Sequence, residues 1–119
     1  MRDLKERTKQ FALRIIQLYG ALPRTSVARV IGKQVLRSGT SVGAHYREAQ
    51  RSRSSAELVS KTEGALQEIE ETGYWLELLA DAGIVPSESL NDLQREVGEL
   101  TAILVTCAKN AKRKMKGEP

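Results

Sequence analysis

The chain has 119 residues, of which 40% are hydrophobic and 4% aromatic, and its formal net charge is +4. This length fits one domain, residues 1–119, with a core of aliphatic side chains and alanine. The single cysteine excludes an internal disulfide.

No stretch approaches the roughly 18 consecutive apolar residues of a membrane-spanning helix. The first ten residues are also too charged to lead into a signal sequence. We therefore expect a soluble, cytoplasmic protein without a membrane partner. Cys107 falls on an apolar helical stripe, so we interpret it as a small core residue rather than a nucleophile.

Apolar residues recur at three- and four-residue intervals in four successive segments, which is the spacing of amphipathic helices. The predicted helices cover residues 3–20, 26–52, 55–82 and 87–115. The three longer ones each span on the order of 40 Å at 1.5 Å per residue. Because the connections are short, neighbouring helices must be antiparallel. The sequence therefore predicts an all-α fold, an antiparallel up-down-up-down four-helix bundle.

Breakers and caps mark the first two helices. Gly20 and Pro23 end the first helix, and Thr25 or Ser26 can cap the second. The predicted buried face of the second helix consists of Val27, Val30, Ile31, Val35, Ser38, Val42, Tyr46 and Ala49.

Similar signals mark the third and fourth helices. Ser54 and Glu57 form a capping box at the start of the third helix, and Gly83 ends it. Pro86 precedes the fourth helix, which has the most regular apolar stripe. This stripe consists of Leu90, Leu93, Val97, Leu100, Leu104, Cys107 and Ala111.

The charge is sorted by segment. Residues 1–53 carry twelve Lys or Arg against three Asp or Glu, residues 54–99 carry two against eleven, and residues 100–119 carry five against one. Such asymmetry indicates either a basic surface for an acidic partner or complementary faces that pair with each other.

The bundle topology places the starts of the first and third helices and the ends of the second and fourth together. The cations expected at this end are Arg2, Lys5, Arg7, Lys9, Arg47, Arg51, Arg53, Lys109, Lys112, Arg113, Lys114 and Lys116. Cations suit the C-terminal turns of helices, but those of the first helix lie at the wrong end of its dipole. This crowding indicates an anionic partner, with solubility or subunit contacts as the alternative.

A second basic feature follows the second predicted helix. Arg29, Lys33 and Arg37 are four residues apart, and Arg47 and Arg51 resume the spacing. Acidic residues recur along the third and fourth helices, at Glu63, Glu70, Glu77, Glu88, Asp92, Glu96 and Glu99. Exposed ion pairs contribute only about 0–1 kcal/mol each. We expect these rows to select helix register and partner, within one bundle or between copies.

Gly39 and Gly43 lie four residues apart inside the second predicted helix. Each glycine costs a helix interior about 1 kcal/mol relative to alanine. The missing side chains allow a close neighbour, either inside the bundle or across a subunit boundary. An anion-binding loop is not favoured, because N–H groups inside a helix are already bonded.

The sequence has no catalytic, metal or cofactor motif. His45 is the only histidine, and neither a haem-attachment motif nor a di-iron motif is present. We interpret His45 as a hydrogen-bonded structural histidine, and Glu68 and Glu71 as solvated or ion-paired rather than catalytic. We therefore expect no enzyme activity, no cofactor and no metal.

Two segments resemble a known family. Residues 37–49 (RSGTSVGAHYREA) and residues 71–79 (ETGYWLELL) are similar to four-helix-bundle proteins encoded in intervening sequences of bacterial 23S ribosomal RNA genes. The resemblance covers most of the chain, from the second helix through the fourth. The family includes the accessory variability determinant of diversity-generating retroelements, a basic homopentamer that contacts the reverse transcriptase and binds nucleic acid. The resemblance thus implies a homo-oligomer, a pentamer, with nucleic-acid or protein partners.

The resemblance also implies roles for individual residues. Packing residues of the second helix would be Ser38, Gly39, Ser41, Val42, Gly43 and Ala44. From the third helix, Tyr74, Trp75 and Leu76 would support the bundle. His45 departs from the pattern, because the family is expected to have Asn at this position.

Our leading hypothesis is a non-enzymatic, homo-oligomeric module that binds the RNA or DNA backbone in a sequence-tolerant, salt-sensitive way. The candidate binding residues are Arg2, Lys5, Lys9, Arg29, Lys33, Arg37, Arg47, Arg51, Arg53, Lys109, Lys112, Arg113 and Lys116. Tyr46, Tyr74 and Trp75 lie near apolar faces, so base-specific stacking is not expected. The alternative is a protein-interaction scaffold whose charges specify self-assembly or a protein partner without nucleic acid.

Overall fold

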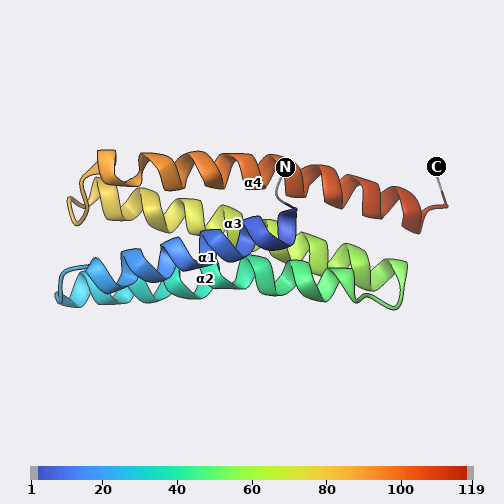
Figure 1. Ribbon diagram of the computed structural model, residues 1–119, viewed down its shortest axis with the longest axis horizontal. Coiled ribbons are helices and arrows are strands. Elements are labelled where there is room, and N and C mark those ends of the chain that lie inside the picture. The colour runs from blue at the N-terminus through green and yellow to red at the C-terminus, as the bar shows by residue number, and fades with distance from the viewer. Residues whose placement is uncertain (1–2, 118–119) are drawn as a thin grey trace.

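Four helices joined by short turns form the computed structural model, which describes residues 3–117 (Figure 1). The helices are α1 Leu4–Ala21, α2 Ser26–Gln50, α3 Ser55–Asp81 and α4 Ser87–Met115. Every predicted boundary lies within two residues of the observed one. Helices adjacent in sequence lie antiparallel and side by side, in a body of 50 × 23 × 22 Å. The predicted antiparallel four-helix bundle is confirmed.

Local signals explain where the helices begin and end. The Thr25 hydroxyl accepts a hydrogen bond from the Ala28 amide at 3.2 Å and caps α2. The Ser54 hydroxyl does the same for the Glu57 amide at 3.1 Å and caps α3. Gly83, with φ of +72°, follows the end of α3 in the left-handed conformation that glycine adopts readily. Each signal was present in the sequence.

The core is aliphatic apart from one aromatic residue. Its buried members are Phe11, Ile15, Val35, Val42, Ala65, Ile69, Leu76, Leu79, Leu90, Leu93, Val97, Leu100 and Leu104. Six residues of the stripe predicted for α4 are buried, whereas Cys107 is partly buried, and burial raises the pKa of its thiol. Among the helices of residues 3–117, none has the length and apolar character needed to cross a membrane.

The predicted buried face of α2 is wrong at its start. Val27 and Val30 are 58% and 65% exposed, whereas Ala28 is fully buried and Gly32 is buried. Small residues face the bundle here because Leu22, just after α1, comes close to α2. The two valines therefore lie on the solvent side.

The contact of α1 with α2 depends on three glycines of α2. A Cβ atom on Gly39 would lie 2.8 Å from Ile15 Cγ1, and one on Gly43 would lie 3.0 Å from Thr8 Oγ1. A Cβ on Gly32 would lie 2.7 Å from a methyl carbon of Leu22. These glycines therefore let α1 approach closely, so the neighbour expected at Gly39 and Gly43 is α1 of the same bundle.

The other residues expected to pack α2 behave differently from one another. Ser38 and Val42 are fully buried, and the Ser38 hydroxyl lies 2.8 Å from the hydroxyl of buried Thr72 on α3. Ser41 is partly buried and donates its hydroxyl to a backbone carbonyl of its own helix. Ala44 is exposed and does not pack within the chain.

The structure places His45 of α2 and the residues Tyr74, Trp75 and Leu76 of α3 in different environments. The Nδ1 atom of His45 is buried and has no hydrogen-bond partner among the described residues, which is against the interpretation of His45 as a hydrogen-bonded histidine. The ring packs against Gly64, where a Cβ atom would lie 2.9 Å from Nδ1. Tyr74 is 55% exposed rather than part of the bundle support, whereas Trp75 is partly buried and Leu76 fully buried.

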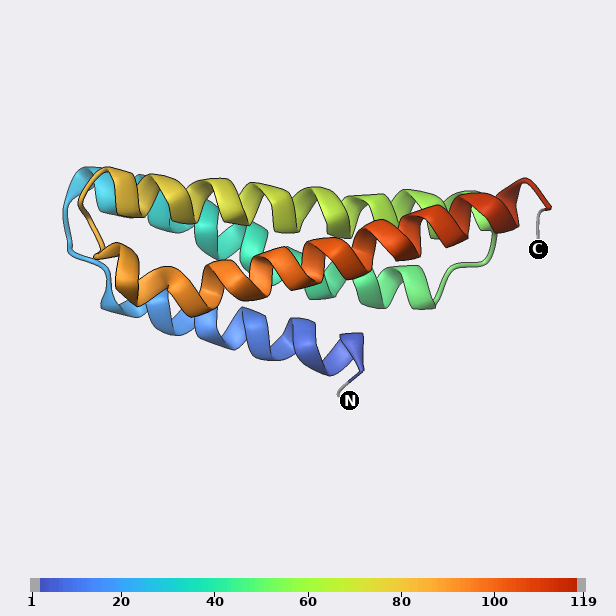
Figure 2. The same cartoon turned by 90° about the horizontal axis from the view of Figure 1, so that it is seen from above.

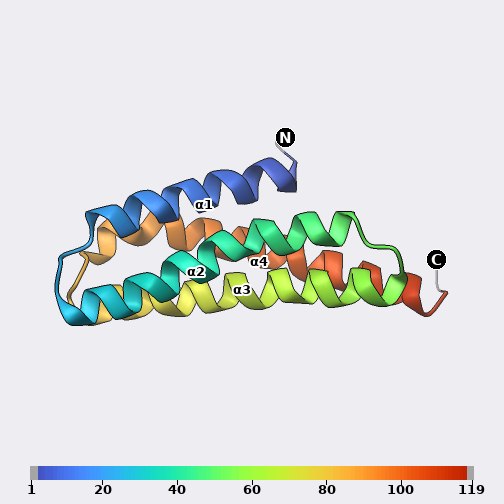
Figure 3. The same cartoon turned by 90° about the horizontal axis from the view of Figure 1, so that it is seen from below.

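Helix α1 is shorter than the other three. It has 18 residues, against 25, 27 and 29 in α2, α3 and α4. Figures 2 and 3 show that α1 begins well before the end of the bundle where α2 meets α3 and where α4 ends. That end of the bundle is built from three helices.

The glycine contact leads to a stability prediction. We expect Gly39→Ala to lower the free energy of unfolding by about 1–3 kcal/mol, because the added methyl overpacks the site occupied by Ile15. Gly98→Ala is the matched control, since an added Cβ on this exposed helical glycine meets nothing within 4 Å. It should raise the free energy of unfolding by about 0.5–1 kcal/mol. Urea unfolding followed by circular dichroism measures both, and equal stabilisation by the two changes would contradict the close contact.

Candidate nucleic-acid interface

Most of the candidate cations are free of acidic partners. Ten are exposed and form no ion pair with a described residue: Lys5, Lys9, Arg29, Lys33, Arg47, Arg51, Arg53, Lys109, Arg113 and Lys116. Arg2 lies outside the described residues. The remaining two, Arg37 and Lys112, are paired.

Arg37 links α2 to α3. Its guanidinium lies 3.1 Å from a carboxylate oxygen of Glu68 and 2.9 Å from one of Glu71. This confirms that the two glutamates are ion-paired. Lys112 pairs with Glu63 at 3.3 Å. These two candidate cations therefore take part in contacts inside the bundle.

Arg7 links α1 to α4, two helices that otherwise touch little. Its guanidinium lies 2.6 Å from Glu96 and 3.0 Å from Glu99. The side chains of Arg7 and Glu96 are only 16% and 15% exposed. The hydrogen bonds that Arg7 donates to the Glu96 carboxylate are the main reason that the pKa of Arg7 is raised above its ordinary value.

This link shows that the cations of α1 do not lie at the end of the bundle where twelve cations were expected together. Along α4, Lys112 follows Glu99 by 13 residues, which is about 20 Å of helix. The start of α1 therefore lies beside the middle of α4, because 18 residues are too few to reach the end of the bundle. The ends of α2 and α4, with the turn after α2, still place cations at one end (Figure 1). We call this set the basic end: Arg47, Arg51, Arg53, Lys109, Lys112, Arg113, Lys114 and Lys116.

Four free cations also share one face of α2. We call Arg29, Lys33, Arg47 and Arg51 the α2 stripe; all four are exposed. Arg29 and Arg47 are 18 residues apart, which is five full helical turns, so they point in the same direction. The α2 stripe is about 33 Å long and ends in the basic end.

Within one bundle, the acidic residues of α3 do not form ion pairs with the α2 stripe. Glu63 pairs with Lys112 of α4, whereas Glu70 and Glu77 are exposed and form no ion pair with a described residue. Arg29 and Lys33 likewise meet no acid among residues 3–117. The described part of the chain thus has two charged faces of opposite sign, a basic one on α2 and an acidic one on α3.

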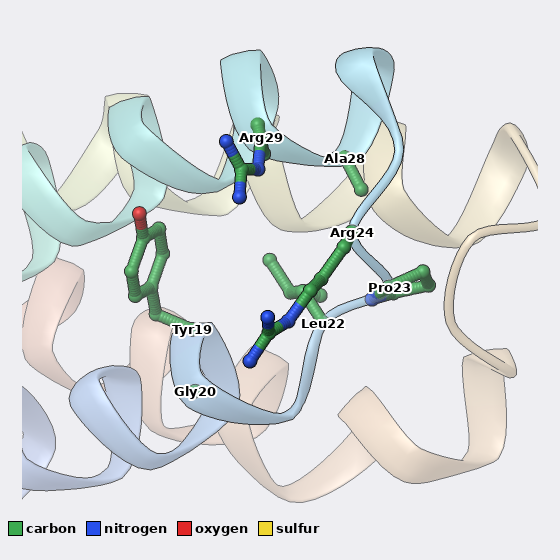
Figure 4. A pocket seen from close by; sticks show the side chains of 7 residues that line it. All are labelled: Tyr19, Gly20, Leu22, Pro23, Arg24, Ala28 and Arg29. Carbon is green, nitrogen blue, oxygen red and sulfur yellow. The ribbon is translucent and has the colours of Figure 1, made fainter.

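Two residues that the sequence pattern did not single out, Tyr19 and Arg24, lie with Arg29 at a cavity of about 340 Å³. The cavity lies at the turn between α1 and α2 (Figure 4). This turn is at the opposite end of the bundle from the basic end (Figure 1). A sequence signal existed, since Arg24 and Arg29 flank the first turn of α2, but the positions of their side chains required the fold.

Comparisons with known proteins agree with the fold. The sequence model of a family described as 23S rRNA-intervening sequence protein matches residues 3–106. The chain belongs to this family. A solved structure, a protein of unknown function from the S23 ribosomal protein family of Bacteroides thetaiotaomicron, is 37% identical with a TM-score of 0.84. The match covers 90% of this chain and 99% of that one. No curated protein matches the chain.

The family membership that residues 37–49 and 71–79 indicated is confirmed. Within residues 3–117, no group of three or more His, Cys, Asp or Glu side chains is placed to hold a metal ion.

The partly buried ion pair between Arg7 and Glu96 gives a second prediction. We expect Arg7→Gln to lower the free energy of unfolding by about 1–3 kcal/mol, because the mostly buried carboxylate of Glu96 loses its charged partner. Adding Glu96→Gln should recover part of this loss. The control is Arg95→Gln, whose pair with Asp92 is 70% and 78% exposed and should matter by less than about 0.5 kcal/mol. A double-mutant cycle by urea unfolding measures the coupling, and equal effects of the Arg7 and Arg95 changes would refute it.

Proposed function

We propose that this protein is a non-enzymatic, homo-oligomeric module that binds the phosphate backbone of RNA or DNA. The observation that carries the proposal is the α2 stripe, four exposed cations on one helix face without acidic partners among residues 3–117. Cations already held by carboxylates would have to break those pairs before they could bind phosphate. The cations of the α2 stripe have no such pairs to break and can bind phosphate directly.

The length of the α2 stripe suits a nucleic-acid strand. About 33 Å of helix lies alongside on the order of ten phosphates of one duplex strand, at 3.4 Å each. The basic end extends this surface with the free cations Lys109 and Arg113 of α4 and Lys116, the C-cap residue of α4. Several weak phosphate contacts in a row give affinity that falls steeply with salt.

The exposed aromatic residue argues for backbone contacts rather than base stacking. Tyr74 is 55% exposed, but Glu70 and Glu77 lie four residues before and three residues after it on the same face of α3. Two carboxylates beside the ring repel a phosphate chain. We therefore infer sequence-tolerant binding.

The test uses a mixed-sequence single-stranded RNA over a range of salt concentrations. Changing Lys33, Arg47 and Arg51 together to Gln should weaken binding at low salt and reduce the slope of log K against log salt by about 2. The control changes Arg14, Lys61 and Arg95 to Gln, three cations outside the α2 stripe and the basic end, of which Lys61 and Arg95 are held in exposed ion pairs. It removes the same charge and should leave the slope nearly unchanged.

Two results would refute the proposal. One is the absence of RNA binding by the unaltered protein at low salt, and the other is binding that does not respond to salt. If the two triple variants have equal slopes, binding depends on net charge alone and not on the α2 stripe.

A second candidate function is a protein-interaction scaffold without nucleic acid. The unpaired acids of α3 favour it, since Glu70 and Glu77 of one copy could face the α2 stripe of another. Exposed Val27 and Val30, which line a shallow apolar hollow of about 260 Å³ with Ser26 and Ile31, add apolar surface near the stripe. Opposed charges between copies would then fix the partner and the register.

This candidate is tested by reversing the acids. We expect Glu70→Lys with Glu77→Lys to shift the sedimentation coefficient toward that of a 13.2 kDa monomer, because like charges would then face each other between copies. The control is Glu88→Lys with Asp92→Lys, two exposed acids on α4. An oligomer that survives the α3 change, or that fails equally with the α4 control, counts against a scaffold built on the α3 acids.

A further inference from the structure

The cavity at the α1–α2 turn surrounds an open space with hydrogen-bond donors. Figure 4 shows the Tyr19 hydroxyl and the guanidinium groups of Arg24 and Arg29 around the same opening, with Leu22 and Pro23 along its floor and side. The cavity has a volume of about 340 Å³. Such a volume is at the small end of the range for small-molecule sites.

The charge of the cavity is uncompensated. None of its lining residues is acidic, and neither Arg24 nor Arg29 forms an ion pair with any residue from 3 to 117. The first turn of α2, which contributes Ala28 and Arg29 to the wall, carries no acidic residue against the positive end of the helix dipole. An anion between the two arginines would offset their mutual repulsion and would also be favoured by the helix N-terminus.

The position of the tyrosine is fixed by the fold. A Cβ atom on Gly32 would lie 3.3 Å from two ring carbons of Tyr19, so the missing side chain lets the ring lie against α2. The Leu22 amide donates a hydrogen bond to the Tyr19 carbonyl at 3.2 Å, which closes the end of α1. The wall that carries the hydroxyl is therefore held by backbone and by close packing.

We propose that this cavity binds a phosphate monoester. Two guanidiniums match the two negative charges of a terminal phosphate, and with the phenolic hydroxyl they offer donors to its three terminal oxygens. An internal phosphodiester carries one charge and two free oxygens, so it uses this set less completely. Leu22, Pro23 and Ala28 give an apolar surface to the organic group that carries the phosphate.

The monoester can come from a free nucleotide or from the phosphorylated 5′ end of an RNA. Only the second source rests on the proposed backbone binding. The two sources are separated by using adenosine monophosphate as one probe and a short RNA, with and without a 5′ phosphate, as the other.

The first experiment titrates the protein with adenosine monophosphate and, in parallel, with adenosine, and follows the arginine Nε signals by NMR. We expect the monophosphate, but not the nucleoside, to shift the signals of Arg24 and Arg29. Arg24→Gln with Arg29→Gln should weaken binding on the order of tenfold or more. Tyr19→Phe should weaken it by a smaller factor. Lys61→Gln with Arg95→Gln removes the same charge far from the cavity and should leave the affinity unchanged.

The second experiment compares RNA of one sequence with a 5′ phosphate or a 5′ hydroxyl. A preference for the phosphate that disappears in the Arg24 and Arg29 double variant identifies the RNA end as the ligand. Monophosphate binding without such a preference identifies a free nucleotide, even if RNA does not bind at all. The proposal is overturned if neither the monophosphate binds nor the RNA with a 5′ phosphate is preferred, or if the Arg24 and Arg29 variant and its control bind equally well. Circular dichroism checks that the variants, altered at two exposed positions, remain folded.

Discussion

The close approach of α1 to α2 across Gly32, Gly39 and Gly43 is the constraint on which the rest of the structure depends. A glycine costs a helix about 1 kcal/mol each time, so α2 accepts a loss of intrinsic stability in order to bring α1 near. In return α1 buries Phe11 and Ile15 completely, although it is the shortest helix and touches α4 only lightly. Alanine at these sites would hold α1 away from the core and move everything that α1 positions.

The same contact determines where the charges lie. Because α1 is held against the glycines and ends at the turn before α2, its start comes beside the middle of α4, where Arg7 meets Glu96 and Glu99. The cations of α1 are thereby separated from the basic end. No helix of residues 3–117 covers the opposite side of α2, so the α2 stripe faces solvent. One packed face and one free face of the same helix thus explain both the bundle and the candidate interface.

Helix boundaries could be predicted within two residues because caps such as Thr25 and Ser54 and stops such as Gly83 act locally. The glycine pair predicted a close neighbour, but only the fold identified it as α1. Val27 and Val30 misled the prediction, because periodicity identifies an apolar stripe and not whether another helix covers it. The basic end was predicted too large, although the 18 residues of α1 already implied a start short of it. Which cations keep acidic partners depends on side-chain positions across helices, as with Arg37 and Glu68, and sequence spacing does not give these.

The two proposed features complement each other chemically. Isolated cations along a straight helix neutralise phosphates but do not distinguish one phosphate from the next, since backbone contacts carry no sequence information. A cavity with two arginines and a tyrosine around one space distinguishes a terminal dianion from an internal monoanion. Arg29 belongs to both, as the first cation of the α2 stripe and as a wall of the cavity. If both proposals hold, a strand anchored by its 5′ phosphate at the α1–α2 turn runs along α2 toward the basic end, so a sequence-tolerant surface would still bind its strand in one direction.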